Sequence, residues 1–184
     1  SNLPKFYLNL KSYKKSLFGI NYCIFLYTRF SIISLIISYM SEQTKVSIAS
    51  DHAGFDLKDQ IIKRLLDCGV DVIDRGPDKK DPVDYPDYAS KVTNDILNEK
   101  AHKGVLVCGT GQGMAMAANK KPGIRAALCY SSEVTKLARE HNDANILTLG
   151  ARVIDEATAL SLVETFLNTD FEGSRHTVRI NKIG

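Results

Sequence analysis

From Lys45 onward, short runs of apolar and β-branched residues alternate with longer segments whose apolar residues recur at helical spacing. Runs of the first kind are typical of buried strands. A chain in which strands and helices alternate forms a parallel sheet with right-handed crossovers and helices on both faces. We therefore predict an α/β fold: a three-layer αβα sandwich, Rossmann-like and doubly wound. Its five parallel strands are expected at residues 46–49, 70–73, 104–107, 125–129 and 145–149.

The helices between these strands are marked by their own signals. Leu57, Ile61 and Leu65 form one apolar stripe, and Gly69 is expected to end that helix. Pro86 favours the first turn of a helix that reaches about residue 98. A last long helix is expected over about 156–167, followed by a polar tail.

A glycine-rich turn, Gly109-Thr-Gly-Gln-Gly113, follows the third predicted strand directly after Cys108. A strand that turns into a helix start in this way exposes backbone N–H groups that can hold an anion. The segment alone leaves two interpretations open: a phosphate loop beside a buried cysteine, or a thiolate placed for proton transfer or acyl chemistry. Met114 stands where a dinucleotide loop needs glycine, and a nucleoside triphosphate loop would need a Lys-Ser/Thr pair, so neither cofactor is expected.

Ligands of parallel sheets bind at the carboxyl ends of the strands. Asp51 and His52 follow the first strand, Tyr85 lies beyond the second, and Arg152 follows the fifth. Asp51 and His52 form an acid–base pair, although an aspartate here could also cap the next helix.

His141 ends the helix that follows the fourth strand. Such a helix runs back toward the opposite edge of the sheet, so a rise of about 1.5 Å per residue puts His141 roughly 15 Å from Cys108 of its own chain. His141 can join that site only from a second subunit. The alternative is a structural histidine stabilised by the helix C-terminus.

Arg175 and Arg179 have the i,i+4 spacing of one helix face. Arginine forks match phosphate oxygens, and the alternative is a solvated basic tail.

The charge and the cysteine content limit the classes of function that fit this chain. Residues 1–40 hold five basic and no acidic residues, which leaves 19 basic against 21 acidic residues in the rest. A mildly acidic folded part argues against nucleic acid as a partner. The cysteines lack metal-binding or CxxC spacing and fit a reducing cytoplasm. We expect Cys68 and Cys129 to be small buried hydrophobic residues.

Residues 1–40 differ from the remainder. The apolar stretch 24–39 is interrupted by Arg29, which is costly within a membrane span. A membrane anchor, a basic targeting segment and a non-native extension all compete. Because Met40 looks like a natural start, we favour a non-native or disordered extension over 1–40 and a single domain over 41–184. No membrane partner is expected.

Several motifs, in this order, resemble the sugar-phosphate isomerase family that includes ribose-5-phosphate isomerase B and galactose-6-phosphate isomerase. The resemblance covers about residues 45–184 and is carried by Ser50-Asp-His-Ala-Gly54, Asp84-Tyr-Pro-Asp-Tyr-Ala89, Cys108-Gly-Thr-Gly-Gln-Gly113, Ala118-Asn-Lys120, Gly123-Ile-Arg-Ala126, His141-Asn-Asp143, Gly150-Ala-Arg152 and Gly173-Ser-Arg-His176 with Arg179.

The resemblance implies an isomerase of the pentose phosphate pathway that interconverts ribose 5-phosphate and ribulose 5-phosphate without metal or cofactor. Cys108 matches the base that moves a proton between C2 and C1, and His141 matches the acid that opens the furanose ring, with Asp51 assisting. The remaining matches bind substrate: the loop Gly109, Thr110, Gly111, Gln112 and Gly113 holds the enediolate, Tyr85 and Asn142 line the sugar, and His52, Arg152, Arg175 and Arg179 clamp the phosphate.

Because His141 can join the Cys108 site only from a second subunit, we predict a homodimer with a shared site. Whether dimers pair into tetramers stays open. Two alternatives for the function also stay open: an isomerase of a six-carbon 6-phosphate such as allose or galactose 6-phosphate, and a non-catalytic module that binds a phosphate ligand.

Overall fold

The computed structural model describes residues 44–183, so the prediction for residues 1–40 lies outside the described part. Five parallel strands form one sheet, as predicted, and their order is β2-β1-β3-β5-β4. Each observed strand lies within about one residue of its predicted position. Their bounds are β1 Lys45–Ser50, β2 Asp71–Asp74, β3 Lys103–Cys108, β4 Ala126–Leu128 and β5 Ile146–Gly150.

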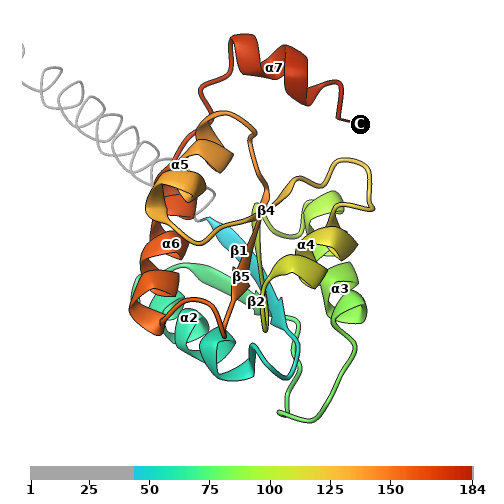
Figure 1. The fold of residues 1–184 in the computed structure, drawn as a ribbon, viewed down its shortest axis with the longest axis vertical. Coiled ribbons are helices and arrows are strands. Elements are labelled where there is room, and N and C mark those ends of the chain that lie inside the picture. Colours follow the sequence, from blue (N-terminus) through green and yellow to red (C-terminus); the bar gives the residue numbers. More distant parts are fainter. Residues whose placement is uncertain (1–43, 184) are drawn as a thin grey trace, which may run out of the picture. The chain divides into compact units, whose positions relative to one another are not determined.

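Helices cover both faces of the sheet, which confirms the doubly wound sandwich (Figure 1). The helices are α2 Phe55–Asp67, α3 Tyr85–Leu97, α4 Gln112–Ala118, α5 Ser132–Glu140, α6 Glu156–Asn168 and α7 Arg175–Ile180. Helices α3 and α4 pack together on one face, and α2, α5 and α6 pack together on the other. None of the helices among residues 44–183 is long and apolar enough to cross a bilayer.

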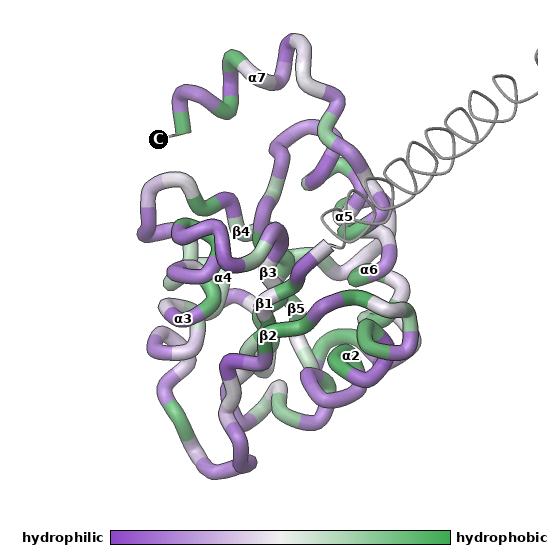
Figure 2. The backbone as a smooth tube through the Cα atoms, turned by 180° about the vertical axis from the view of Figure 1, so that it is seen from behind, coloured by the Kyte–Doolittle hydropathy of each residue, from purple (hydrophilic) through white to green (hydrophobic). Residues whose placement is uncertain are grey.

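Strand alternation divides the core into two layers. Val46 and Ile48 of β1 face α2 and α6, whereas Ala49 faces α3 and α4. Figure 2 shows hydrophobic segments in the sheet and on the helices that cover it, such as α2, whereas α7 alternates hydrophilic and hydrophobic residues.

The C-terminal end of α2 confirms one prediction and corrects another. Gly69, at φ +76°, ends the helix while the Val70 N–H donates to Leu65 O over 2.9 Å. Cys68 is exposed, not buried as predicted. It is the C-cap residue of α2, and because the helix ends there its side chain does not pack into the core. Cys129 is buried, as expected.

The tail holds a further element. The predicted polar tail contains the short helix α7, which places Arg175 and Arg179 one turn apart. Helix α7 lies beyond one end of the sheet, at the top of Figure 1.

The strand order places a switch point between β1 and β3. From β1 the chain moves outward to β2, and from β3 it moves the opposite way to β4 and β5. The crevice at such a point is where α/β sheets bind ligands. Cys108 ends β3 and Asp51 directly follows the last residue of β1, and the Asp51 N–H donates to Val107 O over 3.1 Å. The fold therefore brings two predicted site residues together.

A buried carboxylate anchors α3 to the sheet. Asp95 accepts hydrogen bonds from Ser47 Oγ on β1 (2.7 Å) and from Arg75 Nε and Nη2 (2.6 and 2.7 Å). Burial alone would raise the pKa of Asp95, but the hydrogen bonds from Arg75 and Ser47 outweigh it and hold the pKa below its usual range.

Replacing Asp95 by Asn tests this anchor. Because the folded-state pKa is lowered, the carboxylate stabilises the protein above its unfolded pKa of about 4, and that stability is lost as the pH falls through the folded value. We expect Asp95→Asn to cost about 2 kcal/mol at pH 7 and progressively less below about pH 4. Urea unfolding at several pH values measures this, with the exposed Asp67→Asn as control. A penalty that does not change with pH would contradict the anchor.

Candidate active site

Cys108 ends β3 beneath the glycine loop and is only 5% exposed. The Gly111 N–H donates to Cys108 Sγ over 3.1 Å. Gly111 has φ +80° and caps α4, and a Cβ there would lie 2.5 Å from Leu128 Cδ1 and 3.0 Å from Leu149 C. Only glycine fits this position, so the turn that aims an N–H at the sulfur is fixed by the fold. The cysteine sulfur therefore accepts a hydrogen bond from a backbone donor whose position is set by the turn.

Asp51 and His52 lie beside this loop. Asp51 is buried, and its Oδ1 accepts from the N–H groups of Ala53 and Gly54 (2.9 and 3.0 Å) in the turn before α2. The N-cap of α2 is Gly54 and makes no side-chain cap hydrogen bond, so Asp51 does not cap the helix. Within residues 44–183, Asp51 Oδ2 has no hydrogen bond to protein. His52 Nδ1 accepts from the Val83 N–H over 3.4 Å, which ties the histidine to the segment that leads into α3.

Tyr85 and Arg152 flank the glycine loop on two sides. A Cβ at residue 113 would lie 2.8 Å from Tyr85 Cζ, so the phenol ring packs directly on the loop. The Arg152 N–H donates to Gly109 O over 2.9 Å, and its Nη1 lies 3.4 Å from where a Gly109 Cβ would be. The thiol, a carboxylate, a phenol and a guanidinium therefore meet at one edge of the sheet.

A cavity of about 230 Å³ borders the loop through Thr110, Gln112 and Gly150. Leu128 and Val153 contribute to its apolar wall. A cysteine beside backbone donors and a guanidinium suits an anionic substrate that loses a proton from carbon.

The remaining predicted residues lie at the other edge. Cys108 pairs with Gly150 at the end of β5, whereas His141 and Asn142 precede the first residue of β5, Ile146. The strand between these positions spans about 13 Å at 3.3 Å per residue. The fold therefore separates His141 and Asn142 from Cys108, as predicted.

Arg175 and Arg179 belong to the His141 half as well. His176, between them, stacks on His141 with ring centroids 4.3 Å apart. The predicted site residues of one chain thus fall into two groups at opposite edges of the sheet, the Cys108 half and the His141 half.

The turn that carries His141 is held by two arginines. Asp143, at φ +44°, accepts from Arg139 Nη1 (2.7 Å) and Arg125 Nη2 (2.8 Å). Arg125 Nε also lies 3.1 Å from Asn142 O. Arg125 and Asp143 lie in motifs that the sequence singled out without a role for them, whereas Arg139 was not singled out. The structure shows that these three residues fix the end of α5.

Glu172 and His176 were not among the predicted site residues. Glu172 Oε2 lies 3.9 Å from His141 Nε2 and 3.7 Å from His176 Nε2. Burial lowers the pKa of His176, and the positive charges of His141, Arg175 and Arg179 act in the same direction. The sequence held two signals: the i,i+4 spacing of Glu172 and His176, and the place of His176 in the motif Gly173-Ser-Arg-His176. Neither predicts their contact with α5, because that contact depends on the tertiary fold.

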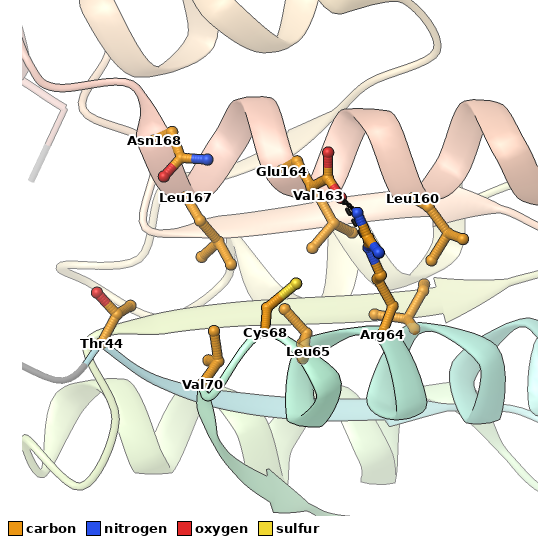
Figure 3. A pocket seen from close by; sticks show the side chains of 11 residues that line it. Thr44, Arg64, Leu65, Cys68, Val70, Leu160, Val163, Glu164, Leu167 and Asn168 are labelled. Carbon is orange, nitrogen blue, oxygen red and sulfur yellow. Dashed lines mark hydrogen bonds and ion pairs between the residues drawn. The ribbon is translucent and has the colours of Figure 1, made fainter.

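A separate pocket of about 400 Å³ lies between α2 and α6 (Figure 3). Its walls include Leu65, Val163 and Leu167, and the ion pair of Arg64 with Glu164 (2.7 Å) crosses it. It contains none of the predicted site residues, so we do not assign the chemistry to it.

Comparison with known proteins gives a consistent set of matches. The profile of the Ribose/Galactose Isomerase family matches residues 46–183. A putative sugar phosphate isomerase of Rickettsia bellii is 48% identical over 138 residues, which cover 75% of this chain and 96% of the relative. Ribose-5-phosphate isomerase B of Escherichia coli is 41% identical over 139 residues, covering 76% and 93%.

Solved structures agree in fold. A ribose 5-phosphate isomerase from Thermotoga maritima is 51% identical and superposes with a TM-score of 0.76, covering 77% of this chain and 98% of that one. Ribose-5-phosphate isomerase B of Clostridium thermocellum is 47% identical with a TM-score of 0.76, covering 77% and 95%.

Two glycine substitutions test how the loop is built. Gly111→Ala places a Cβ against backbone at positive φ, so we expect a loss of about 2–4 kcal/mol in unfolding free energy. Gly113→Ala meets only the Tyr85 side chain, which can move, so we expect a loss below about 1 kcal/mol. Thermal and urea denaturation compare them. Equal losses would show that the backbone at Gly111 is not the constraint.

Proposed function

The chain belongs to the Ribose/Galactose Isomerase family and is an isomerase, and we propose that its substrates are D-ribose 5-phosphate and D-ribulose 5-phosphate. The observation that carries the proposal is the Gly111 N–H aimed at Cys108 Sγ over 3.1 Å. It pairs a carbon base with the donor-lined loop that an enediolate needs.

The first step is opening of the furanose ring. His141 of a second subunit donates a proton to the ring oxygen, while Asp51 Oδ2 takes the proton from the C1 hydroxyl. The bond between C1 and the ring oxygen breaks, and C1 becomes an aldehyde. Tyr85 and the partner's Asn142 line the sugar.

The second step moves the proton. The Cys108 thiolate takes the proton from C2, and the negative charge moves to O1, which N–H groups of the loop from Gly109 to Gly113 hold. A proton then passes from O2 to O1, which moves the charge of the enediolate to O2. The thiol returns a proton to C1 as the carbonyl forms at C2, which leaves the ketose. Because the thiol must stay reduced, we propose that the enzyme works in the cytoplasm.

The phosphate group of the substrate is negatively charged throughout the reaction. His52 and Arg152 approach it from the Cys108 edge, and the partner's Arg175 and Arg179 complete the clamp. Guanidinium groups bind phosphate oxygens in bidentate fashion, which suits this role.

A homodimer follows from the separation of the two half-sites. A two-fold dimer brings the same two surfaces together twice, so each Cys108 edge can face the partner's His141 edge. Met116, Tyr130 and Val153 are more than 60% exposed, and such apolar side chains are suited to burial in a contact between subunits.

A six-carbon 6-phosphate is the second candidate, since the family description names galactose beside ribose. Values of kcat/KM for ribose 5-phosphate, allose 6-phosphate and galactose 6-phosphate separate the two. A higher value for a six-carbon sugar would overturn our choice.

Cys108→Ala tests the base. We expect kcat to fall by about 10²–10⁴-fold, since this removes the group that accepts the C2 proton, while the Kd for ribose 5-phosphate changes less than about threefold. Coupled turnover and calorimetry measure the two quantities. Cys68→Ala, an exposed thiol at the end of α2, is the control and should match the wild type. Unchanged turnover in Cys108→Ala would end the assignment, and a wild type that binds without turnover would identify a non-catalytic module.

Mixing inactive Cys108→Ala and His141→Ala chains tests the shared site. Each mixed dimer has one intact site, so random exchange should recover about a quarter of wild-type activity. Native mass spectrometry confirms that subunits exchange. No recovery after exchange would mean that each site lies within one chain.

A further inference from the structure

We propose that His176 is a positioning residue for His141: the turn from Glu172 to His176 holds the imidazole of His141 in the orientation required for ring opening. The inference rests on the proposed function of His141 and adds two residues, His176 and Glu172, to the machinery around it.

The central contact is the ring stack. The imidazoles of His141 and His176 lie 4.3 Å apart between centroids and 11° from parallel. His141 is half-exposed at the end of α5, whereas His176 is 4% exposed. A buried flat ring beneath an exposed one removes rotamers of the exposed ring, which is what orientation of a general acid requires.

His176 is itself fixed. Arg175 Nε donates to His176 Nε2 over 3.3 Å, which requires a neutral ring with a free lone pair at that nitrogen. The lowered pKa of His176, from burial and from its cationic neighbours, keeps the ring in that form. The Glu172 carboxylate, 3.9 Å from His141 Nε2, faces the same side of the pair.

The backbone folds back so that these contacts form within one short segment. The Glu172 N–H donates to Glu140 O over 3.0 Å, which pins the segment to the end of α5. Gly173 and Ser174 then have positive φ, +65° and +53°, and reverse the chain, and the His176 N–H returns to Gly173 O over 3.0 Å. The segment is therefore held in place at both sides of the reversal.

A cation site is the competing use of the same side chains, because ligand atoms of His141, Glu172 and His176 lie within 4.8 Å of one another. An ion bound by two imidazoles must lie near both ring planes, and parallel stacked planes share no such point. Arg175 also occupies the His176 Nε2 lone pair and adds positive charge. The geometry therefore favours a role in holding His141.

Arg175 gives the arrangement a second consequence. The residue that would bind the substrate phosphate also donates to His176, which stacks on His141. Phosphate recognition and orientation of the acid thus share one side chain.

The test separates ring opening from proton transfer. Ribulose 5-phosphate cannot close a five-membered ring, because the hydroxyl that would close it carries the phosphate. Exchange of its C1 proton with solvent deuterium therefore requires Cys108 and the loop but no ring-opening acid. Turnover of ribose 5-phosphate requires both.

We expect His176→Ala to lower kcat for ribose 5-phosphate by about tenfold or more, with KM within about threefold, since a small displacement of a catalytic group can cost up to about 10²-fold. Deuterium exchange at C1 of ribulose 5-phosphate, followed by NMR, should stay within about twofold of wild type. His176→Phe keeps a flat ring in the stack and should restore kcat to within about threefold. His102→Ala removes an exposed histidine elsewhere and is the control.

Each outcome decides the inference. Equal loss of turnover and exchange in His176→Ala, or failure of His176→Phe to restore turnover while it remains folded, would mean a general structural role and overturn it. If His176→Ala keeps wild-type turnover of ribose 5-phosphate while His141→Ala loses it, the positioning role of His176 is overturned and the proposed acid stands. Full turnover in His141→Ala would instead overturn the proposed acid.

Discussion

A helix that follows a parallel strand must run back along the sheet, and this constraint divides the chemistry of the chain between two edges. The carboxyl ends of β1, β3 and β5 bring Asp51, Cys108 and Arg152 together at one edge. Helix α5 carries His141 to the other edge, where the segment ending in α7 meets it. The separation follows from the topology, and it makes a second subunit necessary to the proposed mechanism.

The two half-sites differ in how they are built. The Cys108 half is mainly backbone: Gly111, which nothing larger could replace, aims its N–H at the Cys108 sulfur. The His141 half is mainly built from side chains. Asp143 accepts hydrogen bonds from Arg125 and Arg139, and His176 stacks on His141. A rigid backbone cradle suits a charge that develops in the transition state, whereas a stacked ring suits a proton donor that must keep one orientation.

The sequence predicted the sheet, the glycine loop and the residues after each strand, because periodicity and glycine placement are local signals. It also placed His141 away from Cys108, since the direction of a crossover helix is a general rule. The exposure of Cys68 was missed although the helix end at Gly69 was predicted, because the spacing of apolar residues does not show which way the side chain of the C-cap residue points. Helix α7 and the contacts of Glu172 and His176 were missed because they depend on a chain reversal at Ser174, a residue that rarely adopts positive φ.

The most direct test of the shared site is a crystal structure of the full chain with ribose 5-phosphate bound to the Cys108→Ala variant. The account predicts that C1 and C2 of the sugar lie over the loop of one subunit, within hydrogen-bond or contact distance of residue 108. It also predicts that the phosphate contacts Arg152 of that subunit together with Arg175 and Arg179 of the partner subunit. A sugar phosphate bound entirely by residues of one chain, or bound away from the Cys108 loop, would contradict it.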